Sequence, residues 1–250
     1  MLAIEELEVR YGKVTAVRSL NLNVDQGEIV GLIGPNGAGK STILSAISGT
    51  KRPSNGSIHY DGRSIVGLRP EQIVELGVSL VPEGRHIFRT LTVLENLILG
   101  GTPRGGARQL TADIETCMDR FPALRQFAKA PAWRLSGGQQ QQLAIARSLL
   151  SKPRLLMMDE PSLGLDPLTI NAVFALIGEL RDEGVTVLLV EQNARRTVEL
   201  ADRCYVMSTG SIVVDGHRED LLATADFSAM YLGRRVSKPI GSTAAPAAEE

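Results

Sequence analysis

The chain has 250 residues, enough to bury a substantial core as one compact unit with a sub-lobe. Its 27 Lys and Arg residues nearly balance 28 Asp and Glu residues, so the formal net charge is -1 and no global basic field exists to hold nucleic acid. Cys117 and Cys204 stand apart without metal-ligand spacing, which predicts two small core residues in a chain kept in a reducing compartment.

The N-terminal segment, MLAIEELEVRYG, does not resemble a secretory signal. Glu5 and Glu6 stand where such a signal needs a basic start and then an apolar stretch. No uncharged apolar segment approaches the roughly 18 to 20 residues that a membrane-spanning helix requires. We therefore expect a protein that is not exported, and we expect any membrane role to be peripheral.

The first predicted elements are strands. Residues 4–12 and 19–28 alternate apolar and polar side chains and end in turn formers, which predicts half-exposed antiparallel strands. Residues 29–34, IVGLIG, form a short apolar run before a glycine-rich loop, which is typical of a buried strand. Residues 40–49 then predict a helix that Gly49 ends, and turn formers divide residues 56–65 into a strand pair.

Strand and helix patterns alternate through much of the remaining chain. Further buried strands are predicted at residues 78–81, 155–159, 185–190 and 204–208. Helical patterns such as residues 168–184 separate them. This alternation predicts an α/β fold with a largely parallel sheet and helical faces, preceded by an N-terminal antiparallel β subdomain.

The strand signal disappears between Glu83 and Trp133. Residues 92–100, 109–121 and 122–130 have helical spacing with Pro and Gly breaks, so an α-helical subdomain is predicted as an insertion at about residues 84–134. Residues 2–235 are predicted to form the ordered domain. Residues 236–250 are low in bulky apolar side chains, and we expect a disordered tail.

The segment GPNGAGKS, Gly34–Ser41, satisfies the pattern GxxxxGK[ST] between a predicted strand and a predicted helix. Its glycines let backbone N–H groups surround phosphate oxygens at a helix N-terminus. Lys40 is predicted to reach the β- and γ-phosphates and Ser41 to bind Mg²⁺. The alternative is an ordinary glycine-rich turn with a solvated lysine. The predicted ATP-binding residues of the resulting P-loop NTPase core are Gly34, Pro35, Asn36, Gly37, Ala38, Gly39, Lys40, Ser41 and Thr42.

A carboxylate for the metal is predicted at the end of another strand. In LLMMDEP, four apolar residues precede Asp159, and Glu160 follows at once. Asp159 is the candidate Mg²⁺ partner through water, and Glu160 is the candidate general base that polarises the attacking water. Paired acids at a strand end also occur as helix caps or surface charges, but the phosphate loop upstream favours the catalytic interpretation.

The segment LSGGQ, which ends 20 residues before Asp159, resembles the signature of the ATP-binding-cassette (ABC) ATPases. The resemblance covers about residues 2–233 and implies the nucleotide-binding domain fold of that family. A Ser-Gly-Gly turn that opens a helix can hold a γ-phosphate, yet Lys40 already serves the chain's own ATP. In the family, the signature contacts the ATP of a partner cassette in a head-to-tail dimer. The signature residues are Leu135, Ser136, Gly137, Gly138 and Gln139.

The same resemblance implies two further roles. Tyr11 looks like the aromatic residue on which adenine stacks, although a lone Tyr at a strand end often only packs. The segment SLGLD resembles the loop that follows the catalytic acid and touches the partner cassette. Its residues Ser162, Gly164 and Asp166 are the candidate dimer-loop residues, and an ordinary Gly-containing turn is the alternative.

Two positions depart from the common cassette pattern. Glu83 stands where most cassettes have a glutamine that binds Mg²⁺ and the attacking water, and Gln192 stands where most have a histidine that contacts the γ-phosphate. Together with VPEGRHIFRTLTVLENL, DEPSLGL and LLVEQNA, these residues resemble the LIV-type branched-chain amino acid importer ATPases, specifically the shorter of their two paired cassettes. The wider pattern is also similar to urea and amide importers, whose corresponding loop more usually keeps glutamine.

Gln192 is assigned to the catalytic site rather than to a helix cap. Asn193 is a better N-cap for the helix that begins ARRTVELAD. A glutamine amide donates a hydrogen bond to a phosphate oxygen much as an imidazole N–H does, but it does not titrate near neutrality. The alternative is that Gln192 only ends the strand.

The resemblance implies an ATPase subunit at the cytoplasmic face of the cell membrane, with ATP and Mg²⁺ as cofactors. Its partners would be a second cassette in a homo- or heterodimer, transmembrane permease subunits and, indirectly, a solute-binding protein, with no nucleic acid. Two alternatives stay open. One is a soluble cassette of iron-sulfur assembly, and the other is a degenerate regulatory cassette that mainly binds ATP.

Overall fold

The computed structural model describes residues 1–102 and 107–223. The predicted tail, residues 236–250, lies outside the described residues, as does the end of the predicted domain at 224–235. Among the helices described, none combines the length and the apolar character needed to cross a membrane.

The N-terminal sheet is antiparallel and has the strand order β2-β1-β4-β5. Its strands are β1 (Leu2–Tyr11), β2 (Val14–Val24), β4 (Asn55–Tyr60) and β5 (Arg63–Ser64). Gly12, at φ +59°, makes the tight turn between the first two strands. Burial alternates along β1 and β2 because one face of the sheet packs on the core and the other meets solvent.

The central sheet is mostly parallel and has the order β10-β9-β3-β8-β7-β6. Its strands are β3 (Ile29–Ile33), β6 (Val78–Val81), β7 (Leu155–Asp159), β8 (Thr186–Glu191), β9 (Arg203–Ser208) and β10 (Ser211–His217). Only β10 pairs antiparallel to its neighbour within this sheet. The predicted fold class, an α/β core with an N-terminal antiparallel sheet and added helices, is confirmed.

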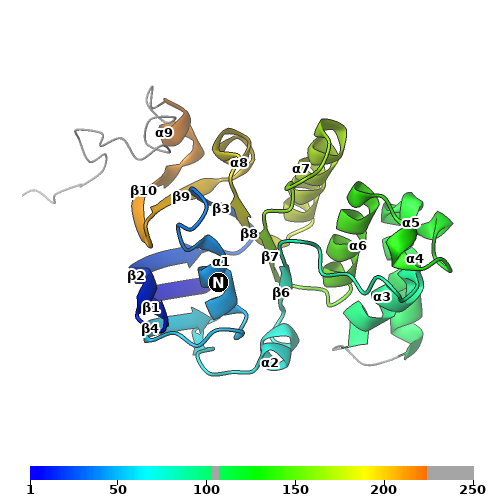
Figure 1. Ribbon diagram of the computed structural model, residues 1–250, viewed down its shortest axis with the longest axis horizontal. Helices are drawn as coiled ribbons and strands as arrows, with labels where there is room; N and C mark the ends of the chain where they lie inside the picture. Colours follow the sequence, from blue (N-terminus) through cyan, green and yellow to red (C-terminus); the bar gives the residue numbers. More distant parts are fainter. Residues whose placement is uncertain (103–106, 224–250) are drawn as a thin grey trace, which may run out of the picture.

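The central strands are buried on both faces, so they read as continuous apolar runs. On β3, Ile29 and Ile33 enter one hydrophobic core, whereas Val30 and Leu32 enter the other. The first core packs against the helical side of the molecule. The second fills the space between the central sheet, α1 and the antiparallel sheet, as Figure 1 allows the reader to follow. The central sheet is thus held rigidly from both sides.

Besides α6 (Gly137–Leu149), five helices of the described residues lie outside the predicted insertion. They are α1 (Lys40–Ile47), α2 (Pro70–Glu75), α7 (Pro167–Asp182), α8 (Ala194–Leu200) and α9 (Arg218–Ala223). Helix α1 ends at its C-cap, Ser48, and Gly49 follows in the left-handed conformation at φ +76°, as the sequence predicts. The strand β10 and the helices α2 and α9 have no counterpart among the sequence predictions.

The segment predicted as an insertion is helical and lies on the side opposite the antiparallel sheet (Figure 1). It contains α3 (Val93–Gly101), α4 (Ala107–Arg120), α5 (Pro122–Gln126) and a 3₁₀ helix at Ala132–Arg134. The next helix, α6 (Gly137–Leu149), returns the chain to β7. Thr92 and Glu95 form a capping box that starts α3. We call α3 to α5 the helical lobe.

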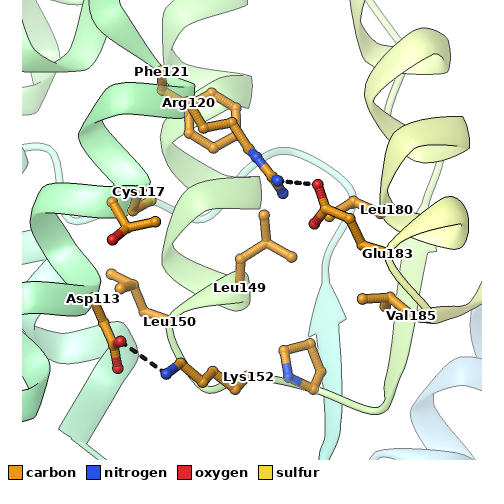
Figure 2. Close-up of a pocket in the computed structure, with 12 residues that line it drawn as sticks. Asp113, Cys117, Arg120, Phe121, Leu149, Leu150, Lys152, Leu180, Glu183 and Val185 are labelled. Atoms are coloured by element: carbon orange, nitrogen blue, oxygen red, sulfur yellow. Dashed lines mark hydrogen bonds and ion pairs between the residues drawn. The ribbon is translucent and has the colours of Figure 1, made fainter.

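A cavity of about 490 Å³ separates α4 of the lobe from the ends of α6 and α7. Apolar and charged side chains both line it, and we call this region the lobe–core junction. Figure 2 shows two ion pairs that cross it, Arg120 with Glu183 and Lys152 with Asp113. Cys117 lines the cavity and is only partly buried, whereas Cys204 is fully buried as predicted. Burial raises the pKa of the Cys117 thiol to about 11, which favours the protonated thiol at neutral pH.

Candidate nucleotide site

Four segments with predicted site residues follow the carboxyl ends of parallel strands. The phosphate loop follows β3, Glu83 follows β6, Glu160 follows β7, and Gln192 follows β8. The register places Ile33 beside Glu191 and Asp159 beside Val190, so these ends lie at one edge of the sheet. Ligands of open α/β sheets bind at this edge, outside the carboxyl ends of the strands.

The phosphate loop needs its glycines for two different reasons. A Cβ at Gly34 would lie 2.5 Å from the Met207 backbone oxygen, so this position packs too closely for a side chain. Gly37 has φ +78° and open space around it. No side chain caps the first turn of α1, where Gly39 is the N-cap. The backbone N–H groups at the start of α1 are therefore oriented as an anion-binding helix N-terminus.

Lys40 lies inside the loop rather than in solvent. Its side chain is 4% exposed, and Nζ donates hydrogen bonds to the Gly34 oxygen at 2.8 Å and the Pro35 oxygen at 3.2 Å. Nζ also lies 3.5 Å from Oε1 of Glu160. The loop therefore holds a positive charge ready for phosphate oxygens before any ligand binds.

Ser41 and Asp159 meet at the start of α1. The Ser41 hydroxyl donates to Oδ1 of Asp159 at 3.1 Å. Burial is the main cause that raises the pKa of Asp159 to about 6, and the negative charges of Glu83 and Glu160 add to it. Hydroxyl and carboxylate oxygens are the ligands that Mg²⁺ prefers, and a cation beside Asp159 would relieve this crowding of negative charge. The residues present therefore fit a bound Mg²⁺. Glu83 itself is exposed on the loop after β6.

Glu160 is buried and has a left-handed backbone at φ +46°. This conformation costs a non-glycine residue about 1–3 kcal/mol and persists only where the surroundings hold it. Its N–H donates to the Val190 oxygen at 2.9 Å. Its side chain is held as well, because Nε2 of Gln192 donates to Oε2 at 2.5 Å. The carboxylate thus lies between Lys40 and Gln192.

Asn193, and not Gln192, caps helix α8. The Asn193 side chain accepts a hydrogen bond from the Arg196 N–H at 3.2 Å, which confirms the sequence prediction. The Gln192 side chain is left to contact Glu160, a contact that the sequence does not predict.

Tyr11 ends strand β1 and is 48% exposed. Nζ of Lys51 lies 4.4 Å from the centre of its ring, a cation–π contact. The aromatic surface is therefore accessible at the end of the antiparallel sheet, beside the residues that follow α1.

The LSGGQ segment opens α6. Ser136 is the N-cap, and it forms a capping box with Gln139 in which Ser136 Oγ accepts the Gln139 N–H at 3.3 Å. A Cβ at Gly138 would lie 2.9 Å from Cγ2 of Thr169, so α6 and α7 approach closely there. The phosphate loop lies on the α1 side of the central sheet, whereas α6 lies on the lobe side (Figure 1).

The SLGLD segment connects Glu160 to α7. Gly164 has φ +68°, and Asp166 caps α7 by accepting the Leu168 and Thr169 N–H groups, each at 3.0 Å. Leu163 and Leu168 expose large apolar side chains. The loop is ordered by its own hydrogen bonds and presents an apolar surface.

Sequence reasoning did not identify Glu191 as a site residue. It ends β8 almost fully buried, and its carboxylate accepts the Ser162 N–H at 3.0 Å and the Gln192 N–H at 3.2 Å. Burial raises its pKa, and the hydrogen bonds from these two residues oppose that rise. The only sequence signal for it is an acid at the end of a strand whose other residues are apolar apart from Thr186.

Comparison with known proteins gives one consistent family. The ABC transporter family profile matches residues 17–163. The chain is 44% identical over 235 residues to the high-affinity branched-chain amino acid transport ATP-binding protein BraG of Pseudomonas aeruginosa, covering 93% of the chain and 100% of the relative. It is 33% identical over 254 residues to BraF of the same organism, a protein of the same description, with 93% and 98% covered.

A solved structure extends the likeness to the whole fold. A dimeric ATP-binding cassette in a post-hydrolysis state, bound to ADP and Pi, matches with a TM-score of 0.78 at 26% identity. The match covers 87% of this chain and 99% of that one. The phosphate loop, the buried acids at the sheet edge and these matches agree. The chain therefore belongs to the ABC transporter family, as one of its ATP-binding cassettes.

Proposed function

We propose that this chain hydrolyses ATP to drive an importer of branched-chain or related amino acids at the cytoplasmic face of the cell membrane. The observation that supports hydrolysis is the position of Glu160, fixed between Lys40 and Gln192 at the edge that carries the phosphate loop. The two Pseudomonas relatives are branched-chain amino acid transport proteins by name, which supports branched-chain amino acids as the cargo. The higher identity to BraG than to BraF, 44% against 33%, supports the shorter type of cassette.

Each residue of the site has a proposed role. Lys40 and the N–H groups of the loop bind the β- and γ-phosphates, and Tyr11 stacks on adenine. Ser41, Asp159 and Glu83 hold Mg²⁺, which neutralises phosphate charge when bound. Glu160 accepts a proton from the attacking water as a general base.

Gln192 contributes a neutral amide. In the structure this amide donates to Glu160, and the same N–H group is suited to donate to a phosphate oxygen. We infer that it exchanges one partner for the other as the nucleotide binds. The carboxylate is then released from its resting contact at the step in which a base is needed.

The signature and the dimer loop act on a second cassette. Ser136 and its neighbouring N–H groups would hold the γ-phosphate of the partner's ATP, and Ser162, Gly164 and Asp166 would contact the partner. ATP then closes the dimer and hydrolysis reopens it, and the helical lobe passes the motion to transmembrane permease subunits. A solute-binding protein delivers the amino acid from outside.

The experiment purifies the tagged chain from native membranes, identifies the subunits that accompany it and reconstitutes the complex in liposomes with ATP inside. We expect ATP-dependent uptake of labelled leucine when the solute-binding protein is added. ATP turnover without uptake of leucine, isoleucine or valine would contradict the proposed cargo and leave the proposed ATPase activity standing. A purification without membrane subunits would favour the soluble alternative, and a complex with no turnover would favour a regulatory cassette.

A further inference from the structure

Glu191 is a buried acid to which the proposed mechanism gives no role. It is 2% exposed at the carboxyl end of β8, and the residues before it on that strand are apolar except Thr186. A hydrophobic side chain would end the strand without the cost of burying a carboxylate. The acid is therefore unexplained by packing alone.

The two carboxylate oxygens of Glu191 hold two different segments. Oε1 accepts the N–H of Ser162, the first residue of the dimer loop, at 3.0 Å. Oε2 accepts the N–H of Gln192 at 3.2 Å. One side chain thus links the loop that faces the proposed partner cassette to the residue that contacts the catalytic acid.

These links enclose Glu160. Its left-handed backbone has its own N–H bound to Val190, and two residues later the Ser162 N–H is bound to Glu191. The Glu160 side chain is bound to Gln192. Hydrogen bonds on either side of Glu160 therefore oppose relaxation of an otherwise unfavourable backbone.

We propose that Glu191 is a positioning residue that ties the dimer loop at Ser162 to the catalytic edge and so keeps Glu160 aimed at the reacting water. The proposal rests on the ATPase function proposed above. In this proposal Glu191 makes no contact with substrate or metal. It acts through the backbone at Ser162 and Gln192, and movement of the dimer loop on partner contact is transmitted to Glu160 through the same carboxylate.

The geometry explains why an acid is needed instead of an amide. Both partners are N–H donors, and an ionised carboxylate offers an acceptor to each. Glutamine has the same shape, but its NH₂ group would face one of the two donors. Glu191→Gln therefore removes one link with little change of volume, and Glu191→Ala removes both.

The matched control is Thr186→Val at the other end of the same strand. Thr186 is fully buried, and its Oγ1 accepts the Gly27 N–H at 2.9 Å, so the variant also removes a buried acceptor for a backbone N–H. It lies at the opposite end of the strand from the site. Thr186→Val and the Glu191 variants should all lower the unfolding temperature. Only the Glu191 variants should change ATP turnover.

The first measurement is ATP turnover by the complex purified from native membranes. For Glu191→Gln we expect kcat to fall about tenfold or more while the KM for ATP stays unchanged, because the phosphate loop is intact and only the base is misplaced. Thr186→Val should keep both constants. If kcat is unchanged in Glu191→Gln, or changes equally in the control, Glu191 is only structural and the proposal is wrong.

The second measurement does not need hydrolysis. Amide hydrogen exchange of the full chain should become about tenfold faster at Ser162 or Gln192 in Glu191→Gln, with the remaining amides near their wild-type rates. Uniform acceleration, as from global destabilisation, would overturn the proposal. If the wild-type complex hydrolyses no ATP, the proposed function fails, while this exchange result still decides whether Glu191 holds the loop. Should Glu191→Ala not fold, Glu191→Gln alone carries the test.

Discussion

The nucleotide site and the lobe–core junction both contain ion pairs, but they hold them differently. At the site, the side chains of Lys40 and Glu160 are 4% and 7% exposed and are tied by further hydrogen bonds to Gly34 and Gln192. At the junction, Lys152 and Glu183 have side chains that are about half exposed, and the two pairs cross a cavity (Figure 2). Their partners are less exposed, Arg120 at 31% and Asp113 at 11%.

This difference separates a fixed region from an adaptable one. Buried charges are costly unless geometry and hydrogen bonds compensate, so a buried pair survives only where it is held in place. Exposed pairs contribute at most about 1 kcal/mol each to the free energy of unfolding, because water readily replaces the partner of each charged group. The proposed catalytic edge is therefore built before the nucleotide arrives, whereas the partly exposed pair of Arg120 with Glu183 at the junction can break at small cost.

The largest expected effect comes from Glu160→Gln. The amide keeps the shape and can still accept from Gln192, but it does not take a proton from water, so kcat should fall about 10²- to 10⁴-fold while ATP binding remains. The matched control is Glu183→Gln at the junction, an acid-to-amide change that should leave turnover near the wild-type value. Equal turnover in Glu160→Gln and the wild type, measured in the assembled complex, would contradict the role of Glu160.

The next largest effect is expected for Lys40→Ala. It removes the buried cation and leaves Glu160 without its counter-charge, so ATP affinity should fall by about 2 kcal/mol or more, a factor of about 30. Lys152→Ala removes a lysine of the junction and should leave ATP affinity unchanged. Direct nucleotide titration of the full chain measures both. Wild-type affinity in Lys40→Ala would contradict the phosphate-loop assignment.

The sequence predicted the strands that carry the site because each is a short apolar run next to a glycine or an acid. The IVGLIG run and the LLMMD run became β3 and β7, and parallel pairing brought Ser41 within hydrogen-bond distance of Asp159 although 118 residues separate them. By contrast β10 is half exposed along its length, its apolar run is confined to residues 212–214, and the sequence did not predict it.

The sequence did not predict contacts between polar residues that lie far apart along the chain. Glu191 differs from an ordinary strand terminus only because the loop after Glu160 turns back and presents the Ser162 N–H to it. The pair between Arg120 and Glu183 depends on how α4 lies against α7. Local pattern predicts elements and their edges, but such pairings follow from tertiary packing.

A smaller effect is expected at the junction itself. A double-mutant cycle with Arg120→Gln and Glu183→Gln should give a coupling free energy below about 1 kcal/mol, since both side chains are partly exposed. Adding about 0.5 M salt should reduce it further, because exposed charges are screened. Denaturant unfolding of the full chain measures this coupling. A larger, salt-independent coupling would mean that the junction is as rigid as the site.

The smallest effect is expected for Gln192→His, because it should alter the rate only at low pH. Above its pKa a neutral imidazole donates a hydrogen bond as Gln192 does, so turnover near pH 8 should match the wild type. As the pH falls, the imidazole gains a proton and forms an ion pair with Glu160. Glu160 then no longer acts as the general base. The nearby carboxylate favours the charged form, so this step should lie above the usual His value of about 6.5.

Glutamine has no such ionisation, so the wild-type profile should lack this step. The test is a pH series of ATPase rates in the assembled complex, with the catalytic acid of the partner cassette disabled so that only one site turns over. Superimposable wild-type and Gln192→His profiles would contradict the prediction. Gln192→Ala completes the test: the 2.5 Å contact with Glu160 ties the amide to the base, so its loss should lower turnover or ATP affinity. If neither changes, Gln192 is only the first residue after β8, and the amide has no part in the fixed region that distinguishes the site from the junction.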